Sequence, residues 1–294
     1  MLYNRCANFL EKGGESAVGI LSDLIASPTD TLISLLYQIP VILIALTLHE
    51  VAHGYVALRC GDPTAQMLGR LSLNPLRHLD PIGTLCMFLF GVGYARPVPV
   101  NSRNFRHFRR DDILVSVAGI GVNFCLFLLG SFLMVIVQGF LFTPEFYQLN
   151  FYTASPLLAK KITALDLLSV NSPYISTYMA NNSLQMLAEN GLTQYLRFSW
   201  LLYVQRFLMT FSITNLGLAF FNLLPVPPLD GYHLFNDILF RGKLHIPARV
   251  MRLITTGMLL LFAFTDVITN LLFTLESAVQ SGVMQGLLWI FRRL

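Results

Sequence analysis

Charged side chains are scarce in this chain, because only 12% of its 294 residues are Asp, Glu, Lys or Arg while 54% are apolar. Soluble proteins carry about 25% charged residues, so the composition excludes an ordinary soluble domain. The mean hydropathy is positive, at +0.60. The sequence therefore predicts an all-α, multi-pass membrane protein.

Cysteine is also rare, and its four copies form no CxxC pair or repeated spacing. This excludes a disulfide framework and a thiolate zinc site. Charged residues interrupt the amino terminus before any apolar core develops, so no cleavable signal peptide is expected. The net charge of +4 comes from arginines beside apolar runs, which indicates membrane topology and gives no reason to expect nucleic-acid binding.

Long uncharged runs can each supply the roughly 20 residues of a membrane-spanning helix. In chain order they are Thr31 to Leu48, Ile113 to Pro144, Phe207 to Leu229, and Leu253 to Leu275 with Asp266 as an interruption. A shorter run, Ile82 to Ala95, contains three glycines and is expected to dip into the membrane without spanning it. We expect about four to six membrane segments, with a short re-entrant or β-like element near residues 91–101.

Three regions follow from this pattern. Residues 1–30 are interpreted as an N-terminal interfacial segment, residues 31–275 as the membrane-embedded core, and residues 276–294 as a C-terminal amphipathic segment. Within the core, residues 143–199 form an excursion outside the membrane. This excursion has balanced charges, as an external loop does.

The arginines predict which segments face the cytoplasm. Eight arginines but only two aspartates lie between Arg59 and Arg110, so the positive-inside rule makes this segment cytoplasmic. The segment from Asp230 to Arg252 is also basic and returns to the same side. The carboxyl end of the first span and Asp230 are therefore expected on one face of the membrane.

The first chemical motif is His49-Glu-Val-Ala-His53, which directly follows the first uncharged run. On an α-helix these histidines are four residues apart, so both imidazoles leave one face and can bind one metal ion. Glu50 can then act as a general base beside a water molecule on the metal. A chance match is the alternative, but ionisable groups are costly to bury in a membrane helix, which favours a functional site.

A catalytic zinc commonly has three protein ligands, so one more is needed. The candidates on the same side are Asp62, Asp80, Asp111, Asp112, Asp230, His78, His107 and His233. Asp230 stands out because it ends the stretch Asn222-Leu-Leu-Pro-Val-Pro-Pro-Leu-Asp-Gly231 after a charge-free span. The prolines must break the helix at membrane depth, where irregular backbone is tolerated only inside protein or beside a water-containing cavity. An ordinary Asp-Gly turn at the membrane surface is the alternative.

These two motifs closely resemble those of the site-2 protease family of intramembrane zinc metalloproteases. That family carries HExxH on one transmembrane helix and NxxPxPxLDG on a later one, and both patterns are present here without a mismatch. Three further segments resemble the prokaryotic branch without a PDZ or CBS domain: Gly69–Gly83, Ala95–Asn101 and Ala118–Asn123. In the last of these, Ile120 stands where the family often has proline. The resemblance covers roughly residues 35 to 250.

The resemblance implies an endopeptidase that hydrolyses peptide bonds within or next to transmembrane segments of membrane-tethered substrates. It implies that His49, His53 and Asp230 bind Zn²⁺, one ion per chain, and that Glu50 activates the water. A zinc-binding transporter and a catalytically silent membrane scaffold stay open as other classes. The chain offers no second intramembrane metal site or repeated halves for transport, and an intact Glu50 argues against the scaffold.

Further residues receive roles from the same resemblance. Asn222 and Asn123 are expected near the substrate backbone or the oxyanion, because a carboxamide donates hydrogen bonds without adding charge. The alternative is that each only bonds a neighbouring helix. Val98 and Val100 could pair with an extended substrate peptide, or belong to a connector that merely packs over the site. His233, three residues after Asp230, could support that ligand.

The expected partners are a transmembrane protein substrate, the lipid bilayer and a membrane regulator. The expected location is a bacterial or archaeal inner membrane, with the active site towards the cytoplasm. The sequence identifies neither the substrate nor the oligomeric state.

Overall fold

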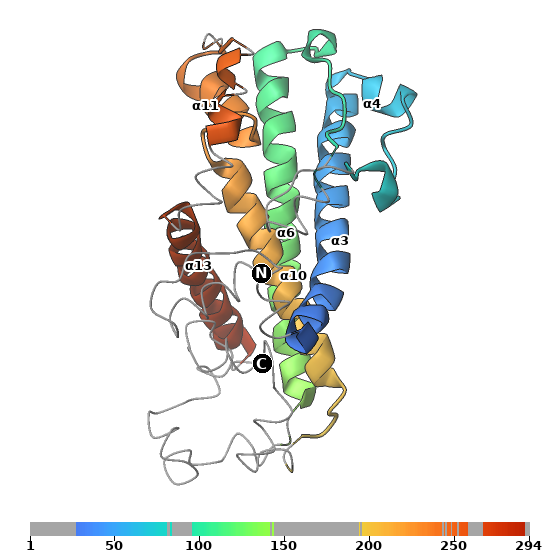
Figure 1. The fold of residues 1–294 in the computed structure, drawn as a ribbon, viewed down its shortest axis with the longest axis vertical. Coiled ribbons are helices and arrows are strands. Elements are labelled where there is room, and N and C mark those ends of the chain that lie inside the picture. The colour runs from blue at the N-terminus through green and yellow to red at the C-terminus, as the bar shows by residue number, and fades with distance from the viewer. Residues whose placement is uncertain are drawn as a thin grey trace.

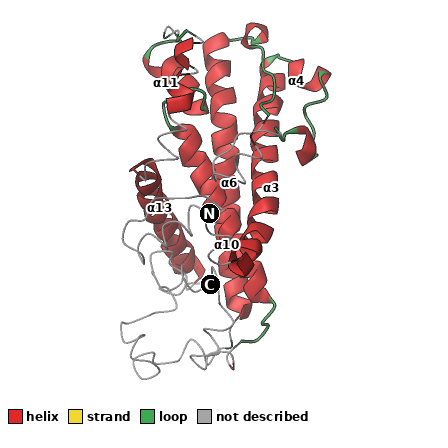
Figure 2. Ribbon diagram, in the orientation of Figure 1, coloured by secondary structure: helices red, strands yellow, loops and turns green. Residues whose placement is uncertain are grey.

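The structure is a computed structural model that describes residues 28–80, 83, 96–141, 143, 194, 196–242, 244, 246–247, 249–251, 253–257 and 267–291. Its α-helices are α3 (Pro28–Cys60), α4 (Thr64–Met67), α6 (Phe108–Leu141), α10 (Leu201–Leu223), α11 (Asp230–Leu239) and α13 (Val267–Phe291), with 3-10 turns η1 (Pro75–Arg77) and η2 (Ser102–Asn104). Every regular element in the described part is helical (Figure 2). The predicted helical character is confirmed.

Helix α6 is the centre of a bundle in which it contacts α3, α10, α11 and α13 (Figure 1). Helices α3 and α6 run side by side in opposite directions, and α10 packs against both. Helix α13 packs on α10 and α6, on the side away from α3. The short helices α4 and α11 lie at the same end of the bundle, so the carboxyl ends of α3 and α10 are at that end too (Figure 1).

Two helical segments are long and apolar enough to cross a membrane: Thr31–Cys60 and Phe108–Leu141. The first contains the predicted span Thr31 to Leu48, and the second covers the predicted span Ile113 to Pro144 as far as Leu141. Helix α10, with 23 residues, is about 35 Å long, which also matches the roughly 30 Å of a bilayer core. The total number of spans and the three-region division stay predictions, and α13 continues without a break across residue 276. The predicted segments within residues 1–27, 84–95 and 144–193 lie outside the described residues.

Two differences between the helix boundaries and the predicted spans bear on the candidate site. Helix α3 continues past Leu48 to Cys60, so the whole His-Glu motif lies inside it. Helix α10 ends at Leu223, before the predicted end at Leu229, and Leu224 already has extended geometry with φ −60° and ψ 134°. The following prolines explain this stop, because they lack the backbone N–H that a helix needs.

The β-like element expected near residues 91–101 is not a strand in its described part, residues 96–101. Residues 96–101 form an irregular connection without a strand. The Arg96 N–H donates to the His78 carbonyl at 2.8 Å, and Leu79 forms an isolated bridge. The segment is irregular because several of its backbone groups bond to side chains of α3 and the loop that follows it.

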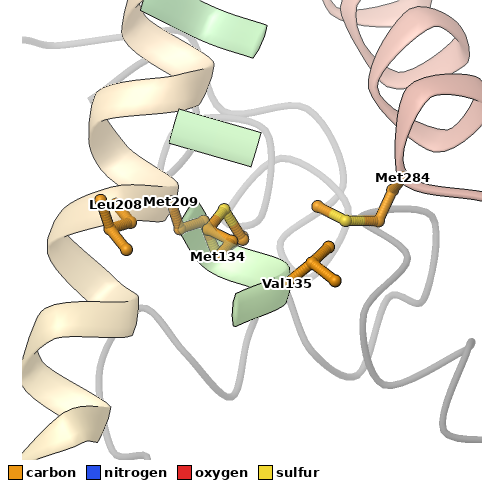
Figure 3. Packing of buried hydrophobic residues seen from close by; sticks show 5 residues of the cluster. All are labelled: Met134, Val135, Leu208, Met209 and Met284. Atoms are coloured by element: carbon orange, nitrogen blue, oxygen red, sulfur yellow. The ribbon is translucent and has the colours of Figure 1, made fainter. Parts of the chain in front are cut away.

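A hydrophobic cluster joins the helices α6, α10 and α13 (Figure 3). It consists of Met134, Val135, Leu208, Met209 and Met284. Nearer the motif, the hydroxyl groups of Ser131 and Ser212 lie 2.8 Å apart, and Ser212 also donates to the Phe127 carbonyl at 3.0 Å. These contacts set the register of α10 beside α6, and they deliver the loop after α10 to the end of α3.

Candidate metal centre

Three potential ligand atoms converge where α3 meets the start of α11. The Nε2 atoms of His49 and His53 are 3.0 Å apart, and each lies 3.2 Å from Asp230 Oδ2. A tetrahedral zinc ion with bonds of about 2.0–2.1 Å places its ligand atoms about 3.3 Å apart. The Oδ2 atom is buried and receives no hydrogen bond, so it lacks the positive partner that a metal ion would supply. The three side chains therefore fit one zinc ion.

The loop before Asp230 brings that carboxylate back toward the histidines. Helix α11 begins at Asp230, directly after the proline-rich turn that ends α10. The next residue must be glycine, because a Cβ atom on Gly231 would lie 2.4 Å from the Leu223 carbonyl oxygen. The Leu-Asp-Gly sequence thus combines a ligand with the close backbone approach that positions it.

One face of α6 lies against both histidines. The His53 Nδ1–H donates to the Val115 carbonyl at 2.7 Å, which leaves Nε2 unprotonated for a metal. A Cβ atom on Gly119 would lie 2.3 Å from His53 Nε2 and 2.5 Å from His49 Cε1, so only glycine admits the pair. The Asn123 amide lies 3.2 Å from His49 Nδ1. These three α6 residues are four apart and therefore share one face.

Glu50 is held by the backbone of the segment that follows the undescribed residues 84–95. The Val98 N–H donates to Glu50 Oε2 at 2.7 Å. Because Pro97 and Pro99 have no N–H, Val98 provides the sole backbone donor of this tripeptide. Arg70 donates to the carbonyls of Arg96 at 2.8 Å and Pro97 at 3.3 Å, and this fixes the segment over the motif.

The side chains of Val98 and Val100 face the protein. Val98 is 7% exposed and touches the position where a Cβ on Gly54 would lie. Val100 packs against the cluster formed by Ala57, Cys60, Phe105 and Val115. Their predicted pairing with a substrate would therefore use backbone groups, of which the Val98 N–H is already bonded to Glu50.

Asp62, an alternative third ligand in the sequence, is fully buried and structurally engaged. It accepts hydrogen bonds from Asn101 N–H at 2.7 Å, from Asn104 Nδ2 at 2.8 Å and from Thr64. Burial raises the pKa of Asp62, but the bonds from Thr64, Asn101 and Asn104 outweigh it and hold the pKa below its ordinary value of 3.8. Asp62 anchors the segment 101–104.

Several other candidate ligands also have partners away from the metal position. The Gly83 N–H donates to Asp80 and the His107 N–H to Asp111, each at 2.8 Å. The His78 ring donates from Nε2 to the Ser72 carbonyl at 2.7 Å. Asp112 lies against Asp237. Among the described residues, the cluster that could hold a metal is His49, His53 and Asp230.

Two predicted accessory residues make no described contact with the three ligands. Asn222 donates to the Leu218 carbonyl of its own helix at 3.0 Å. His233 is exposed, and its ring packs edge-on against Tyr232 with 5.4 Å between centroids. Their roles stay predictions.

The chain belongs to peptidase family M50, whose family model matches residues 37–264. It is 34% identical over 206 residues to a Bacillus subtilis (strain 168) protein named "Putative zinc metalloprotease YwhC", and the alignment covers 70% of each chain. No solved structure matches the chain. These comparisons confirm the site-2 protease resemblance and place the chain in a family of membrane-embedded zinc metalloproteases.

Proposed function

We propose that this chain is an intramembrane zinc endopeptidase of the site-2 type. Its substrates are membrane-tethered proteins, cut within or next to a transmembrane segment. The observation that carries the proposal is the convergence of His49, His53 and Asp230 at zinc-compatible distances. The two histidines and Glu50 lie on α3, which is long and apolar enough to span a membrane. Membership of family M50 supports the same reaction class.

His49, His53 and Asp230 would hold one Zn²⁺ per chain. When bound, zinc supplies a Lewis acid that polarises a carbonyl and acidifies a water molecule. Two neutral imidazoles and one carboxylate leave part of the ion's charge uncompensated, which suits a developing oxyanion. The burial of both histidines limits bulk water around the reacting groups.

Glu50 is the proposed general base. It takes a proton from the attacking water as the new C–O bond forms, and it delivers that proton to the leaving nitrogen as the C–N bond breaks. The Val98 N–H holds one carboxylate oxygen at 2.7 Å and fixes the direction of the carboxylate. The second oxygen is then the one that meets the water.

Asn222 and Asn123 are the proposed amide donors to the substrate backbone or the oxyanion. The Val98 carbonyl and the Val100 backbone are the proposed pairing edge for an extended substrate peptide. Photo-cross-linking from the exposed Pro97, which adjoins Val98, tests this edge, with the exposed Leu253 as a control position. A cross-link to substrate is expected from Pro97 alone, and its absence contradicts the edge.

The proposed setting is a multi-pass protein of a bacterial or archaeal inner membrane, with the metal centre towards the cytoplasm. The basic segments near Arg109 and Arg249, which flank the apolar helices at that end, support this orientation. In the proposed division, residues 31–275 form the protease core between a 1–30 interfacial and a 276–294 amphipathic segment. A membrane regulator is a proposed partner.

Cleavage-site mapping separates this proposal from the scaffold and transporter alternatives. The purified full chain is placed in liposomes with a model transmembrane substrate, and the products are identified by mass spectrometry. The proposal predicts cuts within or beside the transmembrane segment that stop with a chelator and return with added Zn²⁺. Uncut substrate contradicts it, and zinc flux across the same liposomes would favour transport.

A further inference from the structure

His49 presents a hydrogen-bonding problem that His53 does not. Both rings aim Nε2 at Asp230. A histidine that binds a metal through Nε2 carries its proton on Nδ1, and that N–H needs an acceptor. His53 has one in the Val115 carbonyl. The neighbour of His49 Nδ1 is the side chain of Asn123, at 3.2 Å.

The Asn123 amide has one end without a partner. Its Nδ2 atom is the end that faces His49 Nδ1, whereas its Oδ1 atom is buried and has no hydrogen-bond partner. The whole side chain is fully buried on the inner face of α6. An unbonded amide oxygen in such a place is destabilising, because burial removes it from water and no other donor replaces the lost hydrogen bond.

One change in the orientation of the Asn123 amide gives His49 the tautomer that binds zinc and gives the Oδ1 atom a hydrogen-bond partner. An amide N–H facing Nδ1 suits only a ring whose proton is on Nε2, and that tautomer cannot bind zinc through Nε2. Rotation of the amide by half a turn exchanges its oxygen and nitrogen at nearly the same positions. Nδ1–H of His49 then donates to Oδ1, and Nε2 is free for the metal.

We propose that Asn123 is the positioning residue of His49, and that its amide oxygen accepts Nδ1–H whenever the centre holds zinc. This inference rests on the zinc ligation proposed above. Helix α6 then supports both histidines from one face, through the Val115 carbonyl for His53 and the Asn123 oxygen for His49. Gly119 lies midway between Val115 and Asn123 on α6, and it leaves room for both imidazole rings.

The same rotation also moves the nitrogen atom of the Asn123 amide. Its nitrogen moves to the buried place that the oxygen now occupies, where no hydrogen-bond partner meets it. The predicted substrate contact of Asn123 would fall to this N–H, which is fully buried in the absence of substrate. The ligand orientation and the predicted substrate contact of Asn123 thus belong to opposite ends of one side chain.

Zinc affinity of the purified full chain tests the proposal without any protease assay. Competition with a chromogenic chelator is measured for wild type, Asn123→Leu, Asn123→Asp and Asn74→Leu. Leucine keeps the volume but removes the acceptor, so we expect zinc affinity to fall about 10–100-fold. Aspartate keeps the acceptor and should bind zinc at least as tightly as wild type. Asn74→Leu makes the same substitution at an exposed position and should leave the affinity unchanged.

Cobalt provides a second readout that a general loss of packing would not move. With Co²⁺ in the site, the visible absorption spectrum reports ligand geometry. It should change in Asn123→Leu and stay as in wild type in Asn123→Asp. Wild-type affinity in Asn123→Leu, or an equal loss in both variants, would overturn the proposal.

Two reference variants separate this proposal from the proposed function. His49→Ala and Asp230→Ala remove ligands outright and should lose zinc. If they retain it, the metal centre itself is wrong. If they lose it while Asn123→Leu keeps it, only the role of Asn123 fails. Should Asn123→Leu not fold, an affinity in Asn123→Asp far below wild type still contradicts the acceptor role.

Discussion

The positions of His49 and His53 depend on contacts with single atoms of neighbouring residues. Gly119 lies where α6 passes closest to them, and any side chain there would overlap both rings. Val115 offers a carbonyl, so its side chain identity does not matter to His53. Glu50 likewise depends on the backbone N–H of Val98. The centre is therefore shaped as much by backbone and by empty space as by its ligands.

The steric role of Gly119 gives the first prediction. Gly119→Ala would place its Cβ 2.3 Å from His53 Nε2, so at least one ring must move. We expect zinc affinity to fall about 10-fold or more, as for other losses of ligand support. Chelator competition on the purified chain measures it.

Gly121→Ala is the matched control for this prediction. It makes the same change two residues along α6, and its Cβ would meet nothing within 4 Å. Zinc affinity should be unchanged, and helix stability should rise by up to about 1 kcal/mol. Equal zinc affinities in the two variants would contradict the steric account.

At this scale the sequence predicts residues whose chemistry is in the side chain. The spacing of His49 and His53 and the position of Asp230 after a proline-broken span singled out three side chains that the structure brings together, and their binding of zinc stays a prediction. Val115 could not be identified, because every residue has a carbonyl. Once α6 is known to face the motif, the four-residue spacing of Val115, Gly119 and Asn123 indicates that Val115 lies on the same face as the other two residues.

The element that closes over the motif is the connection 96–104. Arg70 holds its start by two backbone carbonyls, and Asp62 holds its end through Asn101 and Asn104. Between these anchors, the Val98 N–H reaches Glu50. The sequence suggested a β-like element here. Its irregular shape could not be predicted, because these donors bond to side chains that are distant in sequence and not to a neighbouring strand.

Loss of the Asp62 anchor should destabilise this element. Asp62→Ala removes a buried carboxylate with partners on Thr64, Asn101 and Asn104. We expect a loss of about 2–4 kcal/mol in unfolding free energy, because hydrogen bonds to buried charged groups are strong. Denaturant unfolding in detergent measures it. Gln66→Ala, an exposed neighbour on α4, should stay within about 0.5 kcal/mol.

The same carboxylate predicts an acid dependence of stability. Its folded-state pKa lies below the ordinary 3.8, so its contribution is fully present above that pH and is lost as the pH falls toward the folded value. Unfolding free energies measured from about pH 5 downward should converge for wild type and Asp62→Ala. A constant difference across this range would show that Asp62 does not act through its charge.

The whole bundle brings two distant parts of the chain to the proposed metal position. Helix α3 supplies the histidines, and the turn after α10 brings Asp230, the first residue of α11, to them. Hydropathy predicted the long helices and the proline-rich stop. It did not predict that α6 lies at the centre. Small and polar residues such as Ser116, Asn123 and Ser131 mark the buried face of α6, but they do not show which helices that face meets.

A metal held by two segments should stabilise the folded chain. Zinc at about 1,000 times its dissociation constant would add about 4 kcal/mol, provided that it binds only the folded state. Removal of zinc with a chelator should therefore lower the thermal midpoint of wild type. Asp230→Ala lacks the α11 ligand and should show little response to the chelator. Equal shifts in both proteins would mean that the stabilising metal is elsewhere.

The most direct test of the central claim joins zinc content and proteolysis in one preparation of Glu50→Gln. Glutamine keeps the size of the side chain but cannot accept the proton from water. The account predicts about one zinc per chain, as in wild type, with cleavage of a transmembrane substrate lowered to background. Cleavage at the wild-type rate by zinc-loaded Glu50→Gln would contradict the assignment of Glu50 as the general base, and with it the mechanism proposed for this chain.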